Sequence, residues 1–297
     1  MHMPFGLFVF FAALVVWFFL LAVGFRRRSF GPFVVFGIVF LVLMNVRYLI
    51  DGAPAAIAFF IGIYDVLDNL GLRAGEGAAA LASCPNNACS VWGETYVLHP
   101  SWGTAFHARF SSDAELRSNL LYAHLTLNSI VFVLMHVQLW RPGTGGNAAW
   151  HKTIGRFSFV CLTLGTASAI WLAGSHGSVS EYGGNLSMVG FWSMSLCVYG
   201  CAVMGVLAIR RGDRVAHRIW MIRFTGSMWG AFWLFRVMLF VLGPLLRDYE
   251  AANLLVCIWL SAPLGILIAE VVRRNLLDKR PHDRSTALGT RRPVANA

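Results

Sequence analysis

The sequence predicts an all-α membrane protein, a polytopic bundle of transmembrane helices. Seven apolar stretches are each long enough to cross about 30 Å of hydrocarbon. Hydrophobic residues make up 57% of the 297-residue chain and charged residues 13%, with a mean hydropathy of +0.63. Lys and Arg residues gather at one side of the predicted membrane. Because every backbone polar group in lipid must be bonded within its own segment, this composition suits helices and excludes a soluble globular protein.

The predicted spans divide the chain into four parts. The spans cover residues 5–25, 29–50, 119–140, 153–174, 186–209, 219–243 and 254–272. We expect an N-terminal transmembrane helix pair (1–50), an extracytoplasmic cap (51–118), a five-helix transmembrane core (119–272) and a basic cytoplasmic tail (273–297). The first stretch lacks a basic start and ends in three arginines rather than a small-residue cleavage site. It is therefore predicted to stay as a helix, not to be removed as a signal peptide.

The basic residues predict the orientation. With the N-terminus outside, 18 of the 24 Lys and Arg residues fall on the cytoplasmic side, and the positive-inside rule then places the C-terminus in the cytoplasm. They are Arg26, Arg27, Arg28, Arg141, Lys152, Arg156, Arg210, Arg211, Arg214, Arg218, Arg223, Arg273, Arg274, Lys279, Arg280, Arg284, Arg291 and Arg292. The +10 net charge is spread over short loops beside lipid, which favours membrane lipids as partners and argues against nucleic-acid binding.

The segment 51–118 is too polar to cross the membrane and holds seven of the 14 acidic residues. Within it, residues 57–70 predict a short amphipathic helix of the kind that lies in the interface. Cys84 and Cys89 stand five residues apart on the oxidising outer side, where we expect a disulfide. No adjacent His completes a metal-ligand set for this pair, so no metal is assigned. The segment is also a candidate surface for a protein partner.

Three ionisable side chains are predicted to share one layer in the outer half of the bundle. At about 1.5 Å per residue from the span midpoints, His124 and Arg236 lie about 8 Å outward and Arg47 about 11 Å outward. Asn128 follows His124 by one helical turn, and Asn45 and Tyr48 flank Arg47. The layer would suit a quinone head group, a haem propionate or a lipid phosphate. The alternative is structural: Arg47 snorkels to the interface and Arg236 bonds backbone carbonyls.

A second group of histidines is predicted near the cytoplasmic surface. His136 lies near the end of its span, whereas His151 and His217 stand at the starts of the fourth and sixth spans. Two such histidines can ligate haem iron or a metal, or carry protons near neutral pH. The alternative is that they and their arginine neighbours bind lipid phosphates and cap helices.

One string of residues is distinctive. It runs from Tyr122-Ala-His124 through Gln138 and His151-x-x-x-Gly155-Arg156 to Gly212-Asp213-x-x-x-His217-Arg218-x-Trp220-Met221-x-Arg223 and Arg236. This pattern resembles the bacterial predicted-membrane-protein family catalogued as domain of unknown function 2306, over residues 119–272. The resemblance implies a bacterial cell (inner) membrane protein and a set of positions to test, His124, His151, His217, Arg223 and Arg236, but no established activity.

Three functions compete. The first is a haem- or quinone-linked membrane redox protein, similar in general layout to cytochrome b561-like bundles. His124 and His136 are 12 residues apart, about 120° around the helix, so we expect at most one haem at either level.

The second is a solute or ion transporter, suggested by Pro32 and Pro263 within spans, although Glu270 is the lone acid in a span and can simply face solvent. The third is a non-enzymatic lipid-binding or assembly protein. No hydrolase motif is present.

Overall fold

A computed structural model describes residues 5–50, 52, 115–140, 148–175, 185–242, 245 and 250–277. Within those ranges the chain is helical apart from short links, and no strand is present. Six helices are long and apolar enough to cross a membrane. The prediction of an all-α, polytopic transmembrane helix bundle is thereby confirmed, and the chain is a multi-pass membrane protein.

The helices follow the predicted spans closely. Each of six predicted spans lies almost entirely within one observed helix, because a long apolar run marks a lipid-crossing helix directly. The helices are α1 (Phe5–Arg27), α2 (Gly31–Ile50), α6 (Glu115–Trp140), α7 (Ala148–Gly174), α8 (Asn185–Arg210), α9 (Arg214–Trp229), η4 (Gly230–Leu234), α10 (Phe235–Leu242), α11 (Glu250–Val272) and η5 (Arg273–Leu277).

The seventh predicted span, 219–243, is an interrupted helix. It corresponds to α9 and α10 joined by η4, a five-residue π-helical turn that starts at Gly230. Helical structure begins earlier than predicted, at Arg214, because Asp213 accepts a hydrogen bond from the backbone N–H of Ala216 at 2.8 Å and so caps α9. This element is not one of the six helices that qualify as a membrane span on length and composition.

The π-helical turn lies where two backbones cross closely. A methyl group added at Gly265 of α11 would overlap the backbone of Gly226 and Gly230. Small residues allow transmembrane helices to approach in this way, and single π-turns commonly mark such irregular positions. α11 consequently packs along both α9 and η4, and also against α8.

The helix pair at the N-terminus is joined to the core by aromatic packing. The ring of Trp17 in α1 stacks on Phe33 of α2, with centroids 4.9 Å apart, and lies 4.2 Å from the ring of Trp233 in η4. Trp17 donates to the carbonyl of Phe33 at 3.1 Å, and Trp233 donates to the carbonyl of Gly37 at 3.2 Å. Buried indoles with satisfied N–H groups fix this contact.

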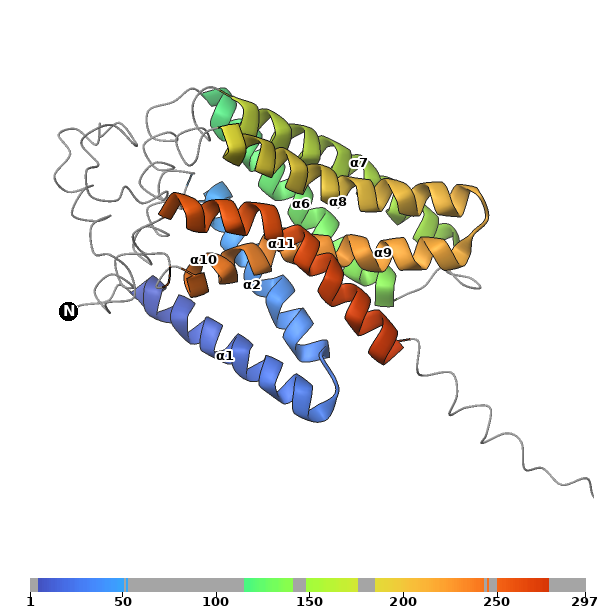
Figure 1. Ribbon diagram of the computed structural model, residues 1–297, viewed down its shortest axis with the longest axis horizontal. Helices are drawn as coiled ribbons and strands as arrows, with labels where there is room; N and C mark the ends of the chain where they lie inside the picture. Colours follow the sequence, from blue (N-terminus) through green and yellow to red (C-terminus); the bar gives the residue numbers. More distant parts are fainter. Residues whose placement is uncertain are drawn as a thin grey trace, which may run out of the picture.

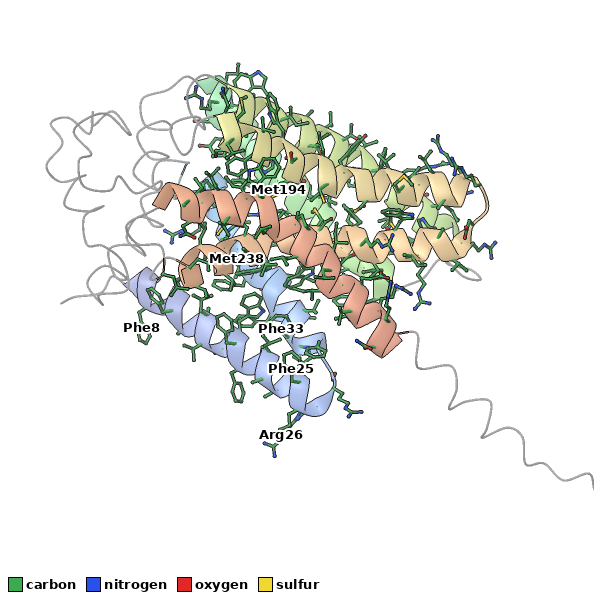
Figure 2. The ribbon with its side chains drawn as sticks, in the orientation of Figure 1. Phe8, Phe25, Arg26, Phe33, Met194 and Met238 are labelled. Carbon is green, nitrogen blue, oxygen red and sulfur yellow. The ribbon has the colours of Figure 1, made fainter. Side chains whose placement is uncertain are left out.

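Apolar side chains cover the outside of the bundle, as lipid requires. Figure 2 shows Phe8 and Arg26 projecting from α1 away from the other helices. Phe8 is 62% exposed and Val15, on the same helix, is 69% exposed. Figure 1 shows α1 and α2 along one side of the bundle and α6, α7 and α8 along the other, with α11 crossing between them.

The basic helix ends lie together. Figure 1 places the α1–α2 link, the α8–α9 turn and the C-terminal end of α11 on one side of the bundle. These ends carry Arg26, Arg27, Arg210, Arg214 and Arg273. The clustering is the arrangement that the positive-inside rule requires of a single membrane face.

Two helices extend slightly past the boundaries of the four predicted parts of the chain. α6 starts at Glu115, so residues 115–118 are helical rather than part of the predicted cap, and η5 extends α11 into the first five residues of the predicted tail. The rest of the predicted cap, apart from Gly52, lies outside the described residues, as does the tail from residue 278. The predicted interfacial helix 57–70 and the Cys84–Cys89 disulfide therefore fall outside them.

Candidate functional site

The predicted site residues separate into two groups. His124 and Arg236 belong to a polar layer within the bundle, which we call the outer polar layer and define as Asn45, Tyr48, His124, Asn128, Ser129 and Arg236. His151 and His217 come together at the basic end of α7 and α9, and we call them the histidine pair. Each group combines residues from different helices.

The histidine pair brings together two predicted ligands from different helices. The ring centroids of His151 and His217 lie 6.5 Å apart, with their planes at 80°. His217 Nδ1 is 2.8 Å from the carbonyl oxygen of Gly205 in α8. A carbonyl oxygen only accepts, so Nδ1 carries the proton and Nε2 of the neutral ring carries the lone pair.

The backbone carbonyl of His151, and not its ring, accepts the hydrogen bond from α6. Gln138 of α6 donates to the carbonyl of His151 at 3.3 Å. The Nδ1 atom of His151 is buried and has no hydrogen-bond partner, which is unusual because buried polar groups are nearly always paired. An orphaned ring nitrogen beside a second imidazole marks a position where a ligand would restore the missing interaction.

Glycines lie beside both histidines. Gly155 follows His151 by one helical turn, and a Cβ there would meet only the Gln138 amide, at 3.3 Å. Gly205 faces the methyl end of Met221, a flexible side chain one turn after His217. An added Cβ at either glycine would thus meet a side chain and not backbone.

Basic residues lie near the histidine pair in sequence. Lys152 and Arg218 directly follow His151 and His217, Arg156 lies five residues after His151, and all three are exposed. An anionic group attached to a bound ligand would find guanidinium and ammonium partners here.

Arg223, a predicted position to test, contacts Trp220 and Glu270. Its guanidinium lies over the ring of Trp220, 4.7 Å from the centroid, and its Nε is 3.5 Å from a carboxylate oxygen of Glu270. Arg273 bonds the same carboxylate at 2.6 and 3.1 Å, and Arg274 bonds it at 2.9 Å. Glu270 does not simply face solvent: its side chain is 14% exposed and binds α11, η5 and α9 together.

His136 is not a member of the pair. It is 4% exposed, its Nδ1 lies 2.6 Å from the carbonyl of Phe132, and its Nε2 accepts from the indole of Trp229 at 2.8 Å. Both ring nitrogens are therefore occupied by protein groups. That His136 lies near the same surface as His151 and His217 stays a prediction, and the indole of Trp229 binds its ring within the bundle.

In the outer polar layer, His124 is oriented by a neighbouring backbone. Its Nδ1 lies 3.1 Å from the carbonyl oxygen of Gly165 in α7, and Asn128 donates to the His124 carbonyl at 2.8 Å. A Cβ at Gly165 would sit 2.8 Å from the Asn128 amide, so glycine lets α7 approach this closely. Nearby, Asn45 of α2 donates to Ser129 of α6 at 2.8 Å.

Arg236 joins the layer through charge. It donates to the carbonyl of Phe232, one turn earlier, at 2.5 Å, and it lies within electrostatic range of His124 and Tyr48. That His124 and Arg236 share a ligand-binding layer stays a prediction, and the bond from Arg236 to a backbone carbonyl is the contact that the structural alternative expected. Arg47 precedes Tyr48 on α2, and its side chain is half-buried.

The backbone partners of the histidines could not be identified from sequence. Gly165 and Gly205 act through carbonyl oxygens, and every residue has one. The Trp229–His136 bond spans 93 residues of sequence. The one local signal was the four-residue spacing of His124 and Asn128, which places both on one helix face.

The helices also contain four cysteines. Cys161, Cys197, Cys201 and Cys257 are free thiols, and all but Cys197 are buried, which agrees with a packing role. Among the residues that the structure describes, no three His, Cys, Asp or Glu side chains come together in a metal-binding group.

Comparisons with known proteins assign no family to the chain. No family model, no curated protein and no solved structure matches the chain.

Proposed function

We propose that the protein is a membrane redox protein that holds one haem between His151 of α7 and His217 of α9. The observation that carries the proposal is the pairing of the two rings from different helices at 6.5 Å. Haem iron is commonly held by His side chains, and these two imidazoles would hold it.

The donor set fits this group. Two imidazoles that would hold one metal through nitrogen bonds of about 2 Å each must have ring centroids farther apart than the about 4 Å that the two bonds span. The observed separation is 6.5 Å. His217 has its Nδ1 fixed by the Gly205 carbonyl, the arrangement that usually orients a ligating imidazole.

The surroundings fit as well. Gly155 removes a side chain one turn from His151, and the exposed Lys152, Arg156 and Arg218 offer cations for propionates. Bound haem would supply a reversible one-electron step. The chain's own part would be to orient the two rings and to neutralise the propionates.

The finer assignments of location belong to the same proposal. The clustered basic ends support a C-terminus in the cytoplasm, and a bacterial inner-membrane location is what the family resemblance implies. The histidine pair then lies at the cytoplasmic side. Residues 51–118 remain the proposed surface for a protein partner on the outer side.

Absorption spectra test the proposal. Protein purified in mild detergent from cells supplied with haem precursor is scanned oxidised and after dithionite reduction. We expect a Soret band that shifts on reduction and is lost in both His151→Ala and His217→Ala. His124→Ala serves as the comparison and is expected to keep the band. A colourless wild-type protein, or a band that survives both pair substitutions, would remove the haem site.

A lipid-binding function is a second candidate, favoured by one observation. Glu270 is contacted by Arg223, Arg273 and Arg274, so three cations share one carboxylate at the basic end. Basic clusters between helices on the cytoplasmic side bind anionic head groups. Retention of anionic lipid through purification, reduced in Arg223→Gln with Arg274→Gln, is the expected result; equal retention in the variant would count against this function.

A further inference from the structure

The polar side chains of the outer polar layer cost free energy inside a bundle that faces lipid. Asn45 is 4% exposed and Asn128 7% exposed, and His124 and Arg236 lie on helices of the same bundle. Polar and ionisable side chains within a membrane usually face one another, a cavity or a ligand. The histidine pair at the basic end does not account for them.

His124 presents one chemically defined atom. Because its Nδ1 faces the Gly165 carbonyl at 3.1 Å, that nitrogen carries the proton. The Asn128 amide nitrogen, also 3.1 Å from Nδ1, instead makes its hydrogen bond to the His124 carbonyl at 2.8 Å. In the neutral ring the lone pair is therefore on Nε2, which can accept a hydrogen bond from a hydroxyl group.

The orientation of His124 depends on three separate elements of the sequence. α6 supplies His124 and Asn128 at a four-residue spacing, α7 supplies the Gly165 carbonyl, and the absence of a side chain at Gly165 permits the approach. A histidine that only filled space would not need an adjacent glycine and a matched amide. The arrangement is preorganised for an interaction at Nε2.

Arg236 supplies the complementary charge. Its bond to the Phe232 carbonyl fixes the guanidinium one turn from its own backbone, and His124 and Tyr48 lie within its electrostatic range. The layer thus brings a hydrogen-bond acceptor from α6, a phenol from α2 and a cation from α10 to one level of the bundle. A ligand that matches them has a hydroxyl hydrogen and an electron-rich oxygen on one apolar body.

We propose that the outer polar layer binds the ring of a lipid-soluble quinone or quinol, with His124 Nε2 accepting from a ring hydroxyl and Arg236 attracting the ring oxygens. The inference rests on the proposed redox function, because it names the class of electron carrier that the protein would meet in the lipid. An isoprenoid or alkyl tail would lie among the exposed apolar side chains of the spans.

Binding of decylubiquinone and of its quinol to purified protein tests the proposal. Dissociation constants are measured by quenching of tryptophan fluorescence and confirmed by calorimetry. His124→Phe keeps a planar ring and removes both nitrogens, and Arg236→Gln removes the charge. We expect each to weaken binding at least about tenfold, the loss of one charge-assisted or buried hydrogen bond. Arg236→Lys keeps the charge and is expected to bind better than Arg236→Gln.

Thr163→Val is the matched control, because Thr163 is a polar side chain of α7 that bonds its own helix at 2.8 Å and is exposed. It is expected to bind as wild type does. Thermal unfolding of every variant shows that it is folded, and Arg236→Gln keeps the test valid if His124→Phe does not fold. Unchanged binding in the folded variants, or no binding by wild type, would overturn the proposal.

Two further outcomes separate the possibilities. An excess of a long-chain fatty acid that displaces the probe completely would show a general site for carboxylates and overturn the quinone assignment. The Soret absorbance of the same samples reports the haem site independently. Protein that binds quinone without haem contradicts the proposed haem site alone, whereas haem-containing protein that binds no quinone contradicts this inference alone.

Discussion

The indole nitrogen of Trp229 donates a 2.8 Å hydrogen bond to Nε2 of His136. The other ring nitrogen of His136 faces the Phe132 carbonyl at 2.6 Å. The opposite side of the Trp229 indole lies near the aromatic rings of the N-terminal helix pair, with Trp17 at 6.4 Å and Phe33 at 6.0 Å between centroids. One indole therefore links α6, α9 and the α1–α2 pair.

Trp229→Phe is expected to destabilise the protein. Phenylalanine preserves most of the aromatic packing but leaves Nε2 of the buried His136 without a donor. An unsatisfied buried polar group costs about 1–3 kcal/mol. The measurement is the thermal unfolding midpoint in detergent, followed with a thiol-reactive fluorophore, because Cys161, Cys201 and Cys257 are buried and react only on unfolding.

Trp171→Phe is the control for the loss of an indole as such. Trp171 is 42% exposed on α7 and is expected to tolerate the change with little effect on the midpoint. Equal destabilisation by the two substitutions would show that the hydrogen bond to His136 is not the cause.

The sequence predicted the helices well because of one simple property. A run such as Gly31–Ile50, with a mean hydropathy of 2.3 in its most apolar window, is compatible with lipid only as a helix, so its length gives its bounds. The depth estimate for His124 and Arg236 used the same regular rise per residue. That these two residues form one site stays a prediction, and Arg236 acts electrostatically on His124 in the structure.

The interruption at Gly230 could not be predicted in this way. Hydropathy does not depend on whether one turn is α- or π-helical, and it does not show that Gly265 on another helix packs against Gly230. The hydrogen-bond partner of His136 could not be predicted for the same reason. The depth of His136 is estimated from its own span, whereas its contact with Trp229 depends on how α9 packs on α6.

Gly265→Ala is expected to destabilise strongly. The added methyl group would overlap the carbonyl oxygen of Gly226 and the backbone of Gly230, and backbone atoms cannot move aside as a side chain does. Overpacking of this kind costs about 1–3 kcal/mol and occasionally more. The midpoint of thermal unfolding in detergent measures it.

Gly200→Ala is the matched comparison, since Gly200 is also helical and nothing lies within 4 Å of an added Cβ. Alanine is the better helix former by about 0.5–1 kcal/mol, so Gly200→Ala should be neutral or stabilising. If both alanines behaved alike, the close crossing of α11 with α9 and η4 would not be a determinant of stability.

Glu270→Gln is expected to destabilise the basic end and to make its stability depend on salt. The substitution leaves the guanidinium groups of Arg223, Arg273 and Arg274 together without the carboxylate that they share. Loss of hydrogen bonds to a charged, mostly buried partner costs about 1–3 kcal/mol. Raising the NaCl concentration screens the remaining repulsion and should narrow the difference in unfolding midpoint between variant and wild type.

Arg274→Gln tests the same cluster from its exposed edge. The Arg274 side chain is 69% exposed, and an exposed ion pair contributes about 0–1 kcal/mol. Its midpoint should stay near that of wild type. A larger loss in Arg274→Gln than in Glu270→Gln would mean that the carboxylate is not the centre of the cluster.

Asp213→Ala is expected to loosen the first turn of α9 and, with it, the position of His217. Asp213 Oδ1 accepts from the Ala216 N–H at 2.8 Å, and the backbone N–H of His217 bonds the Asp213 carbonyl at 3.0 Å. Loss of such a cap costs about 0.5–2 kcal/mol. Asp213→Asn keeps a side-chain oxygen at the cap and should retain most of the stability, as measured by the thermal midpoint.

If the haem proposal holds, Asp213→Ala should also reduce haem retention while Asp213→Asn does not. Equal midpoints for the alanine and asparagine variants would show that the cap does not organise this turn.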